Sequence, residues 1–143
     1  MSSSETKQES DAWNILAHLW QLTQSVLDES APALEAIGLS PKAFFLLTTV
    51  EEHPFPAELA RLMHLPPPTV TYLVKQMEAK GFLKRSAEPG DLRKFRLVLS
   101  AAGRRAIRQS RETIGRVLDT RLKRLDPDEI SQFDRVVQRL AGN

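Results

Sequence analysis

The chain has 143 residues, no cysteine and a formal net charge of +2 at pH 7. This length is typical of one compact domain. The lack of cysteine excludes disulfides, cysteine-ligated zinc, thiol nucleophiles and thiol-based redox switches. The first ten residues are polar and no apolar run approaches the length of a membrane span, so the sequence predicts a soluble cytoplasmic protein with no membrane partner.

Charge is distributed unevenly along the chain. Residues 1–74 hold 3 basic and 9 acidic side chains (−6), residues 75–124 hold 15 and 5 (+10), and residues 125–143 hold 2 and 4 (−2). A strongly positive segment in a nearly neutral chain predicts one surface that faces phosphate groups. A membrane-binding amphipathic helix is the competing interpretation, but the basic residues span several elements rather than one polar helix face.

The N-terminal part of the chain predicts a long helix. A flexible polar tail over residues 1–10 precedes a helix over 11–36, in which Pro32 predicts a kink or a break. This helix carries two apolar stripes, formed by Trp13, Leu16, Ala17, Trp20 and Leu27 and by Ile15, Leu19, Leu22 and Val26. One small core does not need so much apolar surface, so a second body is expected to cover one stripe.

Residues 37–100 follow the order of a winged helix-turn-helix. Ser40 and Pro41 are typical of a helix start, and a short helix over 57–63 follows. Pro67 or Pro68 then begins a helix that Gly81 ends, with apolar residues at i, i+3, i+4 and i+7: Val70, Leu73, Val74 and Met77. Two alternating strands joined by a turn at Pro89 and Gly90 complete the module. The predicted fold class is therefore mainly α (α+β).

The outward arc of the helix after the turn carries varied polar side chains rather than a uniform charged coat. They are Tyr72 and Lys75, flanked by Thr69, Thr71 and Gln76. Such groups suit base edges and phosphates. An ordinary solvated face is the alternative, and the position before a basic hairpin favours DNA binding.

The predicted hairpin adds basic residues to this surface. Lys84, Arg85 and Lys94 are candidates for phosphate contacts. Asp91 lies two residues before Arg93, so a charge-assisted hydrogen bond between them is expected to aim the guanidinium outward.

The C-terminal part predicts a basic helix from Ser100 to Leu125 and a last helix that begins with a capping box at Asp126 and Glu129. We expect the end segments, 11–36 and 101–143, to form a dimerisation region around the DNA-binding region 37–100. Packing within one subunit is the alternative. The expected homodimer interface consists of Trp13, Leu16, Trp20, Leu118, Leu122, Phe133, Val137 and Leu140.

Motifs of other protein classes are missing from the sequence. It contains no glycine-rich phosphate loop, nucleophile elbow, HExxH motif or metal-ligand spacing, so we predict neither an enzyme nor a bound cofactor or metal. A winged-helix module that binds another protein is the stronger rival, although such a module needs no basic stripe and often exposes an apolar patch.

Three segments carry a family resemblance: Pro68–Arg85, Asp91–Arg93 and Leu99–Gly103. They resemble the recognition helix, the wing and the start of the fifth helix of the multiple-antibiotic-resistance regulator (MarR) family of bacterial winged-helix repressors. The resemblance implies a homodimer on a pseudo-palindromic operator of double-stranded DNA. It places Thr69, Thr71, Tyr72, Lys75 and Gln76 in the major groove and Arg93 in the minor groove. Family wings often carry two successive Asp-x-Arg pairs, but here Glu88 and Gly90 replace the first.

The resemblance also implies a small aromatic effector that weakens operator binding. The candidate pocket residues are His18 and Trp20 on the first helix and Phe44 and His53 on or after the second. Core packing is the alternative role for Phe44, and a surface position or an internal hydrogen bond is the alternative for the histidines.

Overall fold

The computed structural model describes residues 3–142, and the side chains of residues 11–91 and 94–142. The elements follow in the order α1 (Ser3–Ile37), α2 (Pro41–Glu52), α3 (Pro56–Met63), α4 (Pro67–Ala79), β1 (Leu83–Glu88), β2 (Asp91–Leu99), α5 (Ala101–Leu122) and α6 (Pro127–Ala141). The chain divides into two compact units. One holds the described residues up to Val26 and from Ile114 onward, and the other holds Leu27–Thr113.

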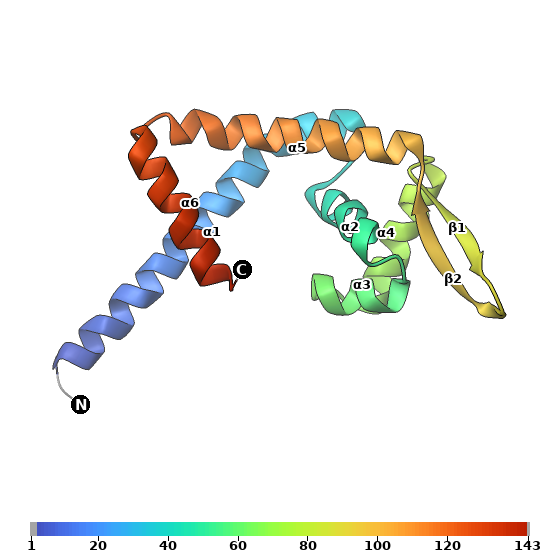
Figure 1. Cartoon of the computed structure of the whole chain (residues 1–143), viewed down its shortest axis with the longest axis horizontal. Coiled ribbons are helices and arrows are strands. Elements are labelled where there is room, and N and C mark those ends of the chain that lie inside the picture. Colours follow the sequence, from blue (N-terminus) through green and yellow to red (C-terminus); the bar gives the residue numbers. More distant parts are fainter. Residues whose placement is uncertain (1–2, 143) are drawn as a thin grey trace. The chain divides into compact units, whose positions relative to one another are not determined.

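The unit over Leu27–Thr113 has the predicted winged helix-turn-helix, in which α2, α3 and α4 gather and the hairpin extends beside them (Figure 1). Ser40 caps α2 as predicted, since its side chain accepts a hydrogen bond from the Ala43 nitrogen at 3.1 Å and Pro41 opens the helix. Leu46 and Leu47 of α2 and Leu59 of α3 are fully buried. These side chains form the core on which α4 rests.

Helix α4 confirms the predicted apolar face, because Val70, Leu73, Val74 and Met77 are all buried. Gly81 ends the helix in the left-handed region with φ of 78°. The nitrogens of Gly81 and Phe82 donate to the carbonyls of Glu78 and Met77 at 3.0 and 2.9 Å. This is the Schellman pattern that glycine permits at a helix end, so the predicted terminator is confirmed.

The hairpin β1–β2 is antiparallel and pairs Leu83 with Leu99 and Ala87 with Phe95. Its turn is Pro89–Gly90, as predicted, with Gly90 at φ of 86°. The register shifts after Ala87, so that Glu88 pairs with Asp91. The amide of Leu97 also donates to the carbonyl of Pro54 at 2.8 Å, which fastens β2 to the segment before α3.

Helix α1 differs from its prediction at two points. It begins at Ser3, inside the segment 1–10 that the sequence assigns to a tail, and it continues through Pro32 without a break, while a kink there stays a prediction. Proline removes only one helical hydrogen bond. Ser30 and Leu34 on either side of Pro32 are fully buried, so packing holds the helix together across this position.

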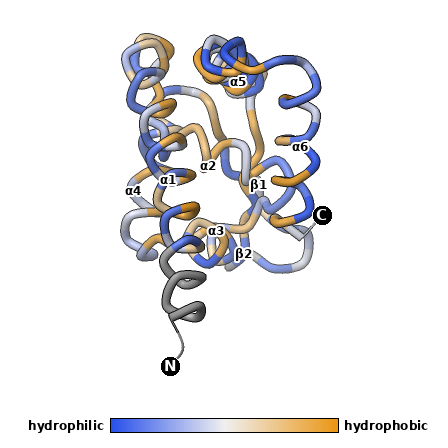
Figure 2. Tube along the Cα trace, turned by 90° about the vertical axis from the view of Figure 1, so that its left-hand side faces the viewer, coloured by the Kyte–Doolittle hydropathy of each residue, from blue (hydrophilic) through white to orange (hydrophobic). Residues whose placement is uncertain are grey.

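The other unit leaves most of its apolar side chains uncovered. On α1, Leu19 and Leu22 are half-buried and Val26 is buried, whereas Trp13, Leu16 and Trp20 are exposed. The predicted capping box of Asp126 and Glu129 is present on α6, and Arg121 donates to the hydroxyl of Ser25. Hydrophobic positions recur along α6 between hydrophilic ones (Figure 2). None of the α6 residues described is buried, and Leu118 and Leu122 of α5 are half-buried.

Membrane-spanning potential is limited in the described residues. No single helix there is long and apolar enough to cross a bilayer, although residues 11–37 and α2, bent by 76°, satisfy the length and composition together.

The start of α5 approaches the backbone after α4 very closely. The hydroxyl of Ser100 donates to the carbonyl of Gly81 at 2.5 Å and accepts a hydrogen bond from the Gly103 nitrogen at 3.0 Å. The nitrogen of Ser100 donates to the carbonyl of Phe82, also at 3.0 Å. A Cβ atom on Gly103 would lie 2.2 Å from the Phe82 oxygen. Glycine is therefore needed at this position for packing rather than for a special backbone angle.

We expect Gly103→Ala to lower the free energy of unfolding by about 1–3 kcal/mol, because the new methyl group meets backbone that cannot move aside. Gly115→Ala on the same helix is the matched control, since nothing lies within 4 Å of a Cβ there. Alanine is the better helix former by about 1 kcal/mol, so this control is expected to be as stable as the wild type or more stable. Urea unfolding of both variants tests this, and equal stability of the two would contradict it.

Candidate nucleic-acid interface

The exposed face of α4 holds the side chains that the sequence predicts for base recognition. Thr71, Tyr72 and Lys75 are exposed, and Thr69 and Gln76 are half-buried at its edges. Tyr72 keeps 61% of its surface exposed. Because the opposite face is buried in the core, these polar groups have a fixed direction.

Two hydrogen bonds order this face. The Thr71 hydroxyl donates to the carbonyl of Pro67 at 3.0 Å. The side-chain amide of Gln76 donates to the Tyr72 hydroxyl at 2.9 Å, one helical turn away. Hydroxyl and amide groups thus lie beside the ammonium group of Lys75, a combination that suits both base edges and phosphates.

The predicted phosphate contacts in the hairpin fall into two groups. Lys84 and Lys94 are exposed. Arg85 is also exposed, but it donates from Nε to a carboxylate oxygen of Glu78 at 2.8 Å, and its guanidinium carbon lies 4.5 Å from the centre of the Phe95 ring. Arg85 therefore links the end of α4 to β2, and part of its charge is neutralised within the chain.

The tip of the wing is described only in part. Asp91 is half-buried and opens β2. The side chain of Arg93 lies outside the described residues, so the expected hydrogen bond between Asp91 and Arg93 stays a prediction.

Arg96 of β2 is a basic residue that the sequence reasoning did not select. Its guanidinium carbon lies 5.7 Å from the Phe55 ring centre, and its Nε lies 3.6 Å from a carboxylate oxygen of Glu88. The alternation of β2 marks Arg96 as outward-facing, but the ring and the carboxylate come from other segments. Arg96 therefore fastens the wing to the start of α3.

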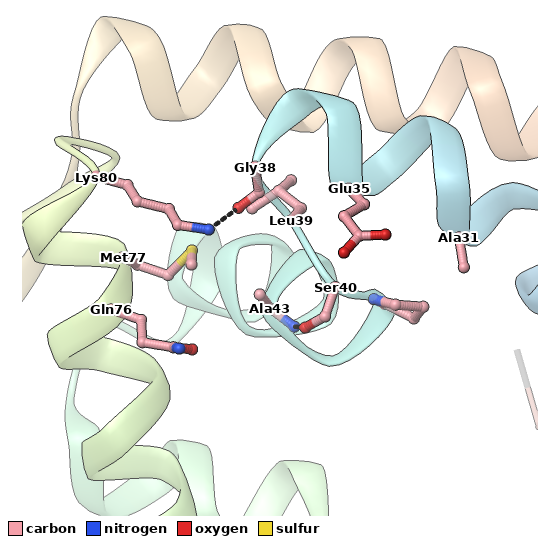
Figure 3. Close-up of a pocket in the computed structure, with 10 residues that line it drawn as sticks. Ala31, Glu35, Gly38, Leu39, Ser40, Ala43, Gln76, Met77 and Lys80 are labelled. Atoms are coloured by element: carbon pink, nitrogen blue, oxygen red, sulfur yellow. Dashed lines mark hydrogen bonds between the residues drawn. The ribbon is translucent and has the colours of Figure 1, made fainter.

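A hollow of about 380 Å³ lies beside the C-terminal half of α4. Gln76, Met77 and Lys80 line it on one side, and the end of α1 and the start of α2 line it on the other (Figure 3). The ammonium group of Lys80 donates to the carbonyl of Gly38 at 2.6 Å. This hydrogen bond fastens the end of the helix to the end of α1.

The four candidate effector residues lie in different surroundings. His18 and Trp20 are exposed on α1. Phe44 is buried in the core of the winged-helix unit, with its ring centre 5.4 Å from that of Phe45. His53 follows α2, and its Nδ1 lies 3.1 Å from a carboxylate oxygen of Glu58. Phe44 therefore has a packing role, and His53 has an internal partner.

The segment that holds this interface is similar to known proteins. Residues 39–95, which run from the start of α2 into β2, match the model of the MarR family. The HTH-type transcriptional repressor Rv2887 of Mycobacterium tuberculosis (strain H37Rv) is 27% identical over 128 residues, which cover 87% of this chain and 91% of the relative.

Solved structures agree with this match. The transcriptional regulator Tm0710 from Thermotoga maritima superimposes with a TM-score of 0.70 at 26% identity, covering 91% of this chain and 93% of that chain. The Mycobacterium tuberculosis MarR family protein Rv2887 in complex with salicylic acid gives a TM-score of 0.71 at 24% identity, covering 85% and 92%. The predicted winged-helix fold is therefore confirmed by comparison as well as by the structure itself.

Proposed function

We propose that this chain, whose residues 39–95 match the model of the MarR family of transcriptional regulators, binds a pseudo-palindromic DNA operator as a homodimer and represses transcription. The observation that carries the proposal is the exposed face of α4, where Thr71, Tyr72 and Lys75 lie opposite four buried apolar residues. Its relative Rv2887 is a transcriptional repressor, which supports repression rather than activation of transcription.

The charge pattern supports DNA as the partner. The segment 75–124, with 15 basic and 5 acidic residues, covers the end of α4, the wing and α5. In the proposed complex, α4 lies in the major groove, where base edges differ in their hydrogen-bonding groups. Lys84 and Lys94 contact the phosphates, and Arg93 reaches the minor groove.

The affinity for DNA from upstream of the chain's own gene is expected to fall steeply with salt, because bound lysines and arginines release counterions. Lys84→Ala should reduce the slope of log K against log salt by roughly 0.9. Arg85→Ala should reduce it by less, because Glu78 already pairs with that guanidinium. Fluorescence anisotropy titrations at several salt concentrations measure both slopes.

Random DNA of the same length is the control for base reading in these titrations. Equal affinity for both DNAs, or no binding to either, would contradict the proposed sequence-specific regulator. Equal slopes for the two variants would contradict the internal neutralisation of Arg85.

The homodimer is proposed from the apolar side chains that one chain leaves in solvent. Trp13 is 68% exposed, Trp20 65% and Leu140 74%. Contiguous exposed apolar surface usually marks an interaction site. Together with Leu16, Leu118, Leu122, Phe133 and Val137, these side chains form the proposed interface between subunits.

We expect sedimentation at micromolar concentration to give the mass of a dimer for the wild type. Leu140→Lys should shift the mass toward the monomer, because it places a charge in the proposed apolar interface. Ser131→Lys is the matched control, since it adds the same charge to an exposed polar position of α6 and should leave the dimer intact. A monomeric wild type would refute the proposed interface.

A small aromatic carboxylate is proposed as the effector that releases the operator. The solved complex of Rv2887 with salicylic acid supports this ligand class. The proposed contacts come from His18 and Trp20, which are exposed on α1.

Salicylate is therefore expected to bind the protein in calorimetry and to lower its affinity for operator DNA. His18→Ala should weaken salicylate binding, because it removes a hydrogen-bonding group from the proposed pocket. His64→Ala, which changes a histidine of the turn after α3, should bind salicylate like the wild type. Unchanged operator affinity in saturating salicylate, with sodium chloride matching the ionic strength, would rule out this effector.

A further inference from the structure

One hydrogen bond joins two of the side chains that face outward from α4. Nε2 of Gln76 donates to the hydroxyl oxygen of Tyr72 at 2.9 Å. Residues four apart lie one above the other on a helix, so the pair needs no backbone distortion. Tyr72 is exposed and is the only tyrosine in the chain.

This hydrogen bond determines what the tyrosine still offers to a partner. A phenolic hydroxyl both donates and accepts. When the Gln76 amide donates to the oxygen, the O–H group of Tyr72 remains free to donate outward. The side chain is then a hydrogen-bond donor in a known direction.

We infer that Gln76 is a positioning residue that makes Tyr72 a donor to one base edge of the operator. The inference rests on the proposed DNA-binding function and adds a rule of base selection to it. In the major groove, guanine offers N7 and O6 as acceptors, adenine offers N7 and thymine offers O4, whereas cytosine presents only its N4 donor. Tyr72 therefore rejects cytosine at the base that it contacts.

The neighbouring residue Thr71 is fixed as a hydrogen-bond acceptor rather than as a donor. Its hydroxyl donates to the carbonyl of Pro67 at 3.0 Å, so its oxygen is left to accept a hydrogen bond from DNA. Thr71 and Tyr72 thus present opposite hydrogen-bonding groups at adjacent positions. Both side chains are oriented by hydrogen bonds within α4 in the absence of DNA.

A purely structural role for the pair predicts different behaviour. A hydrogen bond between exposed side chains four residues apart stabilises a helix only slightly. Such a role would change the melting temperature of a variant but would leave its base preference unchanged. Base preference is therefore the informative measurement.

The test selects binding sites from a random duplex library with four forms of the full chain: wild type, Tyr72→Phe, Gln76→Leu and Gln76→Glu. The wild type should exclude cytosine at one position of each half-site by roughly 2- to 12-fold, the factor expected for one net hydrogen bond. Tyr72→Phe should lose this exclusion, and Gln76→Leu should weaken it because the hydroxyl then rotates freely.

Gln76→Glu tests the polarity directly, since a carboxylate only accepts hydrogen bonds. Tyr72 must then donate to Glu at position 76 and present its lone pair to DNA. The preference should shift toward cytosine at the same position. If Gln76→Glu and Tyr72→Phe both exclude cytosine as the wild type does, the inference is wrong even though the proposed function stands.

A second measurement examines the pair without DNA. Incorporation of 3-fluorotyrosine gives one fluorine NMR signal, from Tyr72. Gln76→Leu should shift this signal, whereas the remote control Glu112→Gln on α5 should not. An unmoved signal in Gln76→Leu would overturn the inference independently of DNA binding. A shifted signal combined with no sequence selection by the wild type would instead refute the proposed function, and the rule of base selection with it.

Discussion

The close approach between the first turn of α5 and the carbonyl of Phe82 is the constraint on which the winged-helix unit depends. A Cβ atom at Gly103 would lie 2.2 Å from that oxygen, and Ser100 bonds the carbonyls of both Gly81 and Phe82. The end of α4, the start of β1 and the start of α5 therefore meet at one backbone junction. The directions of α4 and of the hairpin β1–β2 are therefore both set at this junction.

Internal pairing reduces the charge that the basic segment can offer to a partner. Arg85 pairs with Glu78, Arg96 lies near Glu88, and Arg111 donates to Glu51 at 3.0 Å. Two of them, Arg85 and Arg96, also lie over phenylalanine rings and so contribute to packing. The net charge of residues 75–124 is therefore larger than the charge that remains available to a partner. The exposed lysines of the hairpin are better placed to contact phosphate.

Features that depend on residues close together in the sequence could be predicted, whereas contacts between residues far apart in the sequence could not. The caps at Ser40, Gly81 and Asp126 and the buried face of α4 follow from spacings of a few residues. The partner of Arg85 lies across a helix end, and Gly103 meets a carbonyl 21 residues earlier (103 − 82). Periodicity contains no information on such contacts. Helical spacing places Tyr72 and Gln76 on one face, but only the side-chain geometry shows which of them donates.

The two ends of α4 are held differently, and this difference bears on control of DNA binding. Its C-terminal end is fixed by hydrogen bonds to the end of α1, through Lys80, and to the start of α5, through Gly81. Its N-terminal end starts with prolines, which have no backbone N–H to offer to a phosphate, so recognition falls to side chains such as Thr71 and Tyr72. These lie between two and three turns from the anchored end, roughly 12 to 15 Å at 1.5 Å per residue. In the proposed complex, a small rotation of α4 about this end would displace Thr71 and Tyr72 relative to the operator. In the proposed regulator, an effector or a partner subunit acting on α1 or α5 needs only to disturb that junction to change the fit to the operator.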